Sequence, residues 1–402
     1  EHFGTDSEYL GFLRDSPSAA QRLCHILSNS RFLGDALNKS VESVTWLGND
    51  DSLQPRSRES LDIQTKATLE RNAGNINDFA NSIRAMRRHE IERIGLAWMS
   101  GVIDDEASLA GMTDVYDAAI EASLQWAIQH RINDIQIDEA PAAIAIIGMG
   151  RYGGREVNFS SDADVIIIYR PAEGADDDQA NLFARKVQED LRAILQGPTT
   201  FEPKIELDMD LRPEGKNGPL VRSYASCEEY YRSWASTWEH QALLRARYAA
   251  GDASLAEDFL MNIADPLRYP KIDLTETQIA EIRKLKARME AERLPRGVRR
   301  DRHLKLGKGG LSDVEWTIQL LQLQHAGDNA NLRVNGTLQA LNELEHRKLI
   351  SAGDAVVLRK AWRMCTAARN GSYLWSGRVN QADILPDDSY SLGGIAVYLG
   401  YD

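Results

Sequence analysis

The chain has few cysteines, no long apolar run and fewer basic than acidic residues, and each shortage excludes a class of protein. Its 402 residues include Cys24, Cys227 and Cys365, none of which forms a Cys-x-x-Cys unit. We therefore expect neither a zinc site nor a disulfide framework, and a reducing cytoplasm as the location. No run of about 18 apolar residues could cross a membrane, and no signal peptide is recognisable.

Basic residues are outnumbered over the whole chain but gathered in one segment. The chain has 47 Lys and Arg against 60 Asp and Glu, a formal charge of −13, which argues against a nucleic-acid partner. Residues 283–308 nevertheless hold eleven Lys and Arg against three acids. This segment is either a solvated helix face or, through Lys305, a surface that faces phosphates or an acidic partner protein.

The length leads us to expect two or three packed units, and three regions follow one another along the chain. The predicted domains are a helical region at 1–135, a small mixed-sheet core at 136–255 and a helical bundle at 270–402. The fold class is therefore α+β, with a small sheet between helical flanks and helix predominating overall. Because the chain begins with Glu1 rather than Met, we expect a piece of a longer polypeptide.

The core is recognised by short β-branched runs. Residues 142–147 (AAIAII) and 165–169 (VIIIY) are apolar and bounded by polar residues or glycine, which predicts buried strands. Residues 204–211 (KIELDMDL) alternate apolar and acidic residues, which predicts a half-buried strand. Residues 181–195 and 226–250 read as helices.

A glycine loop after the first run allows two interpretations. Gly148, Gly150 and Gly153 match the G-x-G-x-x-G dinucleotide fingerprint, but no helix is expected to open on them and position 168 is Ile where the fingerprint needs an acid. The alternative begins at Gly153-Gly154 and leads through a short connector to Ser160-Ser161-Asp162-Ala163-Asp164. We favour the second interpretation.

The acidic pair in that segment has the pattern of a metal site. Residues two apart on a strand share a face, so Asp162 and Asp164 are expected on one side. Neighbouring carboxylates repel each other unless a cation lies between them, and Mg²⁺ takes carboxylate and phosphate oxygens. Asp208, in the next acidic strand, would complete a two-metal cage. An isolated D-x-D more often caps a loop. The combination of Gly-Gly, a short connector, D-x-D before an apolar strand and a later acidic strand favours a catalytic metal site.

At these residues the sequence resembles the glutamine synthetase adenylyltransferase family. The resemblance covers roughly residues 80–330 through GMGRYGGREVNFSSDADVII, DMDLRPEGKNGPLV, TWEHQALLRARYAAGD and LKLGKGGLSDVEWTIQ. It implies a nucleotidyltransferase core that moves AMP from ATP to a tyrosine of glutamine synthetase. Long members carry an adenylylating half and a half that removes AMP by phosphorolysis. The string TWEHQAL at 237–243 resembles the adenylylating, carboxyl-terminal half.

The resemblance also implies site residues and partners. Asp162, Asp164 and Asp208 would hold two Mg²⁺ ions, or Mn²⁺, and carry the catalysis of in-line attack on ATP. The implied nucleotide contacts are Gly153, Gly154, Ser160, Ser161, Arg151, Arg212, Glu239, Arg247 and Lys305. Glutamine synthetase is the implied protein substrate, and the PII signalling protein a further partner.

Departures and alternatives stay open at this point. Arg151, Ala163 and Asp210 differ from the usual family residues, and Asp210 either adds a charge beside Asp208 or faces solvent. Asp313 and Glu315 either stabilise a helix amino terminus, with Ser312 as a cap, or belong to the site. The alternative functions are phosphorolysis of AMP-tyrosine and a non-catalytic module that binds PII.

Overall fold

The computed structural model describes residues 7–198 and 202–401, so positions 1–6 of the predicted first domain, 199–201 of the core and 402 of the bundle lie outside the described residues. Helices make up the first third of the chain, and side-chain caps set several of their starts. The Asn75 side chain accepts from the amide of Asn77, and Asp104 accepts from Ala107. In chain order these helices are α1 (Ser7–Asp15), α2 (Pro17–Asn29), α3 (Arg31–Lys39), η2 (Val41–Gly48), α4 (Asp50–Leu53), α5 (Arg58–Arg71), α6 (Ile76–Met99) and α7 (Asp105–Asp134).

A small mixed sheet follows, which confirms the predicted α+β fold. Its order is β3-β2-β1-β5, with β4 also paired to β2. The central pair β1 and β2 is antiparallel, whereas β3 and β4 run parallel to β2. A dinucleotide-binding unit needs a parallel crossover at this point, so the antiparallel pair rules that interpretation out. The strands are β1 (Ala142–Gly148), β2 (Ala163–Pro171), β3 (Leu207–Asp208), β4 (Val221–Ser223) and β5 (Arg247–Gly251).

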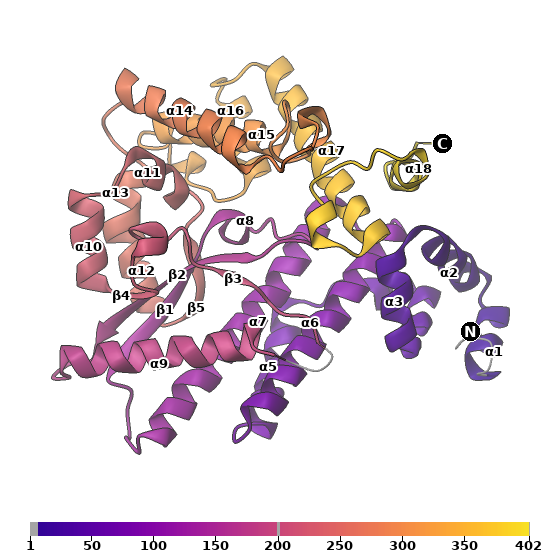
Figure 1. Ribbon diagram of the computed structural model, residues 1–402, viewed down its shortest axis with the longest axis horizontal. Coiled ribbons are helices and arrows are strands. Elements are labelled where there is room, and N and C mark those ends of the chain that lie inside the picture. The colour runs from indigo at the N-terminus through magenta and orange to yellow at the C-terminus, as the bar shows by residue number, and fades with distance from the viewer. Residues whose placement is uncertain (1–6, 199–201, 402) are drawn as a thin grey trace.

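Helices cover both faces of the sheet, which explains why β1 and β2 are apolar on both sides. Helices α7 and α9 lie along one face, with α6 beside them (Figure 1). Ile146 and Ile167 belong to the apolar cluster on that face. The other face carries Ile147, Ile166 and Ile168 toward α10, α12 and η4. The elements of the core outside the sheet are α8 (Gly150–Gly153), α9 (Asp177–Gln196), η3 (Gly215–Asn217), α10 (Tyr224–Ser233), α11 (Thr237–Leu243), α12 (Ala253–Asp258), η4 (Phe259–Ala264) and α13 (Asp265–Arg268).

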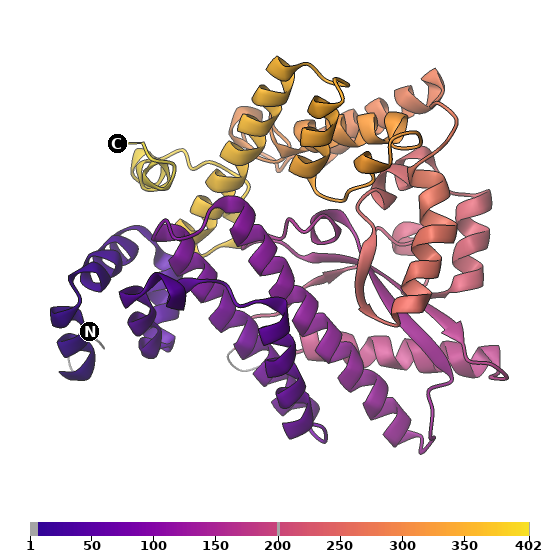
Figure 2. The same ribbon diagram turned by 180° about the vertical axis from the view of Figure 1, so that it is seen from behind.

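The last third of the chain forms a helical layer with its own apolar cluster, which includes Leu311, Ile318 and Trp362. Its long helix α17 then returns to the first helices, where the Ser30 hydroxyl donates to the carbonyl of Leu374 at 2.7 Å. The two ends of the chain therefore lie on the same side of the molecule (Figures 1 and 2). The elements are α14 (Glu276–Arg293), η5 (Arg300–Arg302), α15 (Leu311–His325), η6 (Ala330–Leu332), α16 (Thr337–His346), α17 (Ala352–Ser376), η7 (Val379–Gln381) and α18 (Ser389–Tyr398).

The predicted helix at 226–250 is wrong. α10 ends at Ser233, and Ser236 with Glu239 forms a capping box that starts the separate helix α11. Residues 247–251 then pair with β1 as strand β5, because a sheet edge was available to them. The strand expected at 204–211 is confined to two residues.

Two further local expectations need correction. One helical turn, α8, does open on the glycine loop, although it is only four residues long. Gly310, and not Ser312, is the cap residue of α15. Within the described residues, none of the helices has both the length and the apolar character needed to cross a membrane.

The buried face of β1 makes a quantitative prediction. Ile146 is fully buried between the sheet and its helices. Ile146→Ala should lower the free energy of unfolding by about 2–5 kcal/mol, because it removes packed methylene groups and leaves a cavity. Ile63→Ala, at a position 66% exposed, is the matched control and should stay within about 0.5 kcal/mol. Urea unfolding measures both, and equal losses would contradict the packing described here.

Candidate active site

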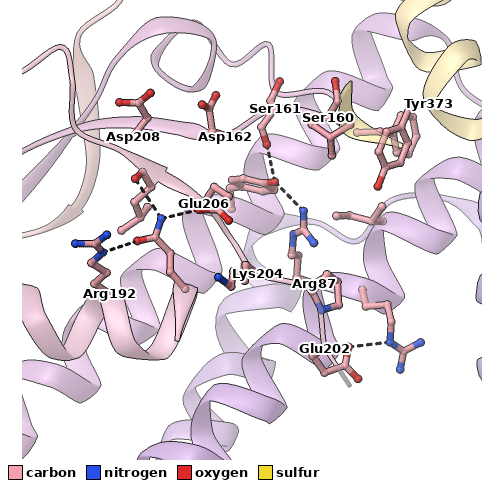
Figure 3. A pocket seen from close by; sticks show the side chains of 18 of the residues that line it. Arg87, Ser160, Ser161, Asp162, Arg192, Glu202, Lys204, Glu206, Asp208 and Tyr373 are labelled. Atoms are coloured by element: carbon pink, nitrogen blue, oxygen red, sulfur yellow. Dashed lines mark hydrogen bonds and ion pairs between the residues drawn. The ribbon is translucent and has the colours of Figure 1, made fainter. Parts of the chain in front are cut away.

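Three carboxylates lie at the end of the sheet where β2 begins. Asp162 precedes the strand, Asp164 is its second residue, and Asp208 on parallel β3 is the register partner of Asp164. Register partners on adjacent strands point to the same face, so Asp164 and Asp208 share one side of the sheet. Figure 3 shows Asp162 and Asp208 next to each other on one wall of a cleft.

Asp164 is the carboxylate most affected by its surroundings. Burial raises its pKa, the charges of Asp162 and Asp208 raise it further, and the resulting pKa is about 7. Lys305 and Arg151 oppose this shift from the other side. A carboxylate whose ionised form is disfavoured by burial and by two like charges gains most from a bound cation.

Glycine is required beside this carboxylate. Gly150 has φ +52°, and a Cβ placed on it would lie 2.1 Å from Oδ2 of Asp164. The amide of Met149 also donates to the carbonyl of Asp164 at 2.8 Å, so the loop is held against β2. The glycine loop thus serves first to make room for the acidic side chain.

The donor atoms suit a hard divalent cation, although they do not form a closed cage. No three His, Cys, Asp or Glu side chains among the described residues come together closely enough to hold a metal ion. Mg²⁺ commonly takes one or two protein carboxylates and completes its shell with water and substrate phosphates. Two carboxylates in register, Asp164 with a pKa near 7 and Asp208, fit that kind of site in donor type together with the neighbouring Asp162.

The first group of predicted nucleotide contacts lies around the connector before β2. Ser160 and Ser161 line the cleft, and both hydroxyls donate to Oδ1 of Asn158, at 3.2 and 2.7 Å. Gly153 and Gly154 instead pack closely on Arg245, since a Cβ on either would approach it within 2.3 Å or less. Their direct contact with a triphosphate remains a prediction.

A buried ionic cluster lies behind Asp164. Arg151 donates to Oε1 of Glu315 at 2.5 Å, and Arg369 on α17 is paired with Asp383. Burial, then the charges of Arg369 and Arg151, lower the pKa of Lys305, which therefore lies among these groups. The structure brings the predicted residues Arg151 and Lys305 together on one side of Asp164. Arg369 and Asp383 carry no local sequence signal and were missed.

Three other predicted nucleotide contacts are bonded to the protein itself. Arg212 lines the cleft but donates to the carbonyls of Met209, at 2.7 Å, and Gly218, at 3.0 Å. Arg247 lies on β5, not on a helix, and is bonded to Asp117 at 2.8 Å. Glu239 closes the α11 capping box by accepting from the amide of Ser236 at 2.8 Å.

Two acidic residues left open by the sequence have clear partners. Asp210 lies 3.2 Å from the Nζ of Lys216, and its own amide donates to Oδ1 of Asp208 at 2.7 Å. Its carboxylate therefore interacts with the turn that follows β3. Asp313 accepts from the amide of Gly309 at 2.7 Å and pairs with Lys286, near the start of α15. That arrangement matches stabilisation of a helix amino terminus.

The cleft beside the carboxylates has a volume of about 1110 Å³. Its floor includes a bonded chain that sequence reasoning missed. Arg87 on α6 donates to the hydroxyl of Tyr116 on α7 at 2.9 Å, and that hydroxyl donates to the carbonyl of Ser161 at 3.0 Å (Figure 3). These contacts tie the serine connector to the first helical layer, so the amino-terminal helices help to position Asp162.

Comparison with known proteins decides the family. The sequence model of the glutamate-ammonia ligase adenylyltransferase family matches residues 20–262. The chain belongs to that family. A second model, GlnD PII-uridylyltransferase, matches residues 282–402. The family predicted from the four motifs is therefore confirmed.

Curated relatives match the whole chain. It is 79% identical over 401 residues to a bifunctional glutamine synthetase adenylyltransferase/adenylyl-removing enzyme of Bifidobacterium longum, covering 100% of this chain and 37% of the relative. It is 41% identical over 404 residues to the enzyme of the same name from Mycobacterium tuberculosis, covering 100% and 40%. The chain thus spans well under half of these relatives, whose names cover both activities.

The pKa of Asp164 predicts a pH dependence of stability. The folded carboxyl binds its proton more tightly than an unfolded one with a pKa near 3.8, so without metal the contribution of Asp164 to the free energy of unfolding should fall as pH rises from about 4 to 7. Asp164→Asn should reduce this fall by up to about 1.4 kcal/mol per pH unit in chemical unfolding. Asp210→Asn is the exposed control and should keep the wild-type slope. An unchanged slope in Asp164→Asn would contradict the burial and repulsion described here.

Proposed function

We propose that this chain transfers AMP from ATP to a tyrosine hydroxyl of glutamine synthetase and releases pyrophosphate. The observation that carries the proposal is the register of Asp164 with Asp208, beside Asp162, within the residues that the family model matches. The names of the relatives support the partner enzyme and the reaction class. The proposed cofactor is Mg²⁺, with Mn²⁺ as an alternative, and the proposed metal ligands are the three carboxylates.

The chemistry needs an activated acceptor and a neutralised leaving group. When bound, divalent cations would lower the pKa of the tyrosine hydroxyl and offset charge on the pyrophosphate. Asp208 lies on the cleft wall, where it can orient the acceptor. Asp164 faces the glycine loop and the Lys305–Arg151 cluster, which would attract the phosphates of ATP. Ser160 and Ser161 would offer hydroxyl donors between the acceptor and the phosphates.

The forward direction is favoured by one local feature. The string at 237–243 resembles the adenylylating half of the family, although the structure gives its Glu239 a capping role. Phosphorolysis of AMP-tyrosine is the second candidate, because the relatives' names include adenylyl removal. A module that binds PII is a third, which the similarity of 282–402 to a PII-uridylyltransferase favours. The division into domains at 1–135, 136–255 and 270–402 is part of the same proposal.

Incubation with the partner enzyme separates these candidates. The chain should incorporate label from α-³²P-ATP into unmodified glutamine synthetase when Mg²⁺ is present. Release of ADP from adenylylated glutamine synthetase with phosphate, without incorporation in the forward assay, would assign phosphorolysis instead. Neither activity, together with retained binding of PII, would favour the regulatory module.

Removal of either of the two register-paired carboxylates should abolish transfer. Asp164→Asn and Asp208→Asn should each lower the rate of AMP incorporation by at least about 10³-fold. Each removes a proposed ligand of the metal ions that would stabilise the charge of the transition state. Asp210→Asn is the matched control, since its carboxylate is paired with Lys216, and should stay within about threefold. Circular dichroism checks that all three variants fold. Activity that survives in a folded Asp164→Asn variant would refute the metal-site assignment.

A further inference from the structure

We propose that the groove beside Asp162 and Asp208 binds an extended, acidic segment of the acceptor protein around its target tyrosine. This inference rests on the proposed function. It adds where the protein substrate binds and which charge the residues around its tyrosine carry. It follows from three properties of the groove, namely the side of the carboxylates on which it lies, its length and its unpaired cations.

The carboxylates separate two different environments. Asp164 faces Gly150, Lys305 and Arg151, where buried cations suit the phosphates of a nucleotide. The open cleft is lined by Asp162 and Asp208 and not by Asp164. In-line attack at a phosphorus requires the acceptor and the leaving group on opposite sides of the reacting atom. The cleft is therefore the side from which an acceptor hydroxyl would approach.

The two adjoining hollows are larger than a nucleotide alone needs. A second hollow of about 980 Å³ continues the cleft along α9 and shares Arg192, Lys204, Glu206 and Lys216 with it. Either hollow by itself is at or above the upper end of the range for small-molecule sites, which is about 300–1000 Å³. At the far end of the first, Tyr373 packs between Phe32 and Phe159, with ring centroids 5.0 and 6.0 Å away. The groove thus runs from an aromatic wall past the carboxylates to α9, a shape that suits an extended polypeptide.

Unpaired cations set the preferred charge of that polypeptide. Lys39, Arg192 and Lys204 are exposed on the lining and make no ion pair with any residue in 7–198 or 202–401. By contrast, Arg88 is paired with Glu202 at 2.9 Å and Lys216 with Asp210 at 3.2 Å. Figure 3 shows Arg192 and Lys204 across the cleft from Asp208 and Asp162. The lining also carries Glu206, whose carboxylate accepts from the side-chain amide of Gln196 at 2.9 Å, and the proposed metal ligands Asp162 and Asp208. With a cation on those two ligands, the three unpaired cations would outnumber Glu206 and attract acidic side chains that flank the tyrosine.

Kinetics with the protein substrate test the groove directly. The triple variant Lys39→Glu, Arg192→Glu and Lys204→Glu should raise the KM for glutamine synthetase about tenfold or more, with kcat and the KM for ATP within about twofold. The matched control reverses three exposed lysines outside the groove, Lys66→Glu, Lys284→Glu and Lys360→Glu, and carries the same net charge. It should leave all three constants unchanged. A raised KM for ATP in the groove variant would assign the groove to the nucleotide and overturn the proposal.

A binding measurement keeps the inference testable even if no transfer is found. The probes are two fluorescent 12-residue peptides with a central tyrosine, one flanked by Asp and Glu and the other by Lys. The acidic peptide should bind the wild-type chain in anisotropy titrations and weaken about tenfold in the groove variant only. Equal binding of both peptides, or equal loss in the control variant, would refute the acidic acceptor segment. Transfer failure with intact acidic-peptide binding would overturn the proposed function while supporting the groove.

Discussion

The parallel pairing of two residues on β3 with the start of β2 is the constraint on which the site depends. It sets Asp208 directly beside Asp164, and β3 is only two residues long. A slip of one residue would turn Asp208 to the opposite face of the sheet. The pairing is braced from both ends, by the amide of Ala163 bonded to the carbonyl of Glu206 and by Arg212, which holds the turn after β3.

The rest of the molecule is arranged around the repulsion that this pairing creates. The carboxylates gather where the helical layer of the last third supplies buried cations and the first helices supply an open cleft. Lys305 and Arg151 reduce the repulsion from one side, but they leave the pKa of Asp164 near 7. The remaining imbalance is what a divalent cation and a phosphorylated substrate would offset.

Local patterns were sufficient to predict the fold class, the central strands and the acidic pair. The runs at 142–147 and 165–169 became β1 and β2, because β-branched apolar segments of that length are stable only when both faces are covered. The helix predicted at 226–250 failed because strand β5 is held by its partner β1, which lies a hundred residues earlier. Long-range pairing of this kind has no local signal.

The predicted contacts of the site also divide into those with a local sequence pattern and those that depend on long-range packing. Glu239 and Arg247 stand out in the motif, yet their side chains cap a helix and pair with Asp117. Arg369 and Asp383 lie outside every motif and approach Lys305 only after α17 has folded back. Charged residues in a motif can thus have a structural role, while residues that affect the charges near the site come from distant parts of the chain.

Calorimetric titration of Mn²⁺ in the presence of a non-hydrolysable ATP analogue tests the central claim most directly. At pH 6.5, ion binding should release protons, because a cation beside Asp164 favours its ionised form. Asp208→Asn and Asp164→Asn should both weaken ion binding, and Asp164→Asn should also abolish the proton release. Asp210→Asn should behave as the wild type does. Unchanged affinity and proton release in the first two variants would contradict a metal site built on the pairing of β2 with β3.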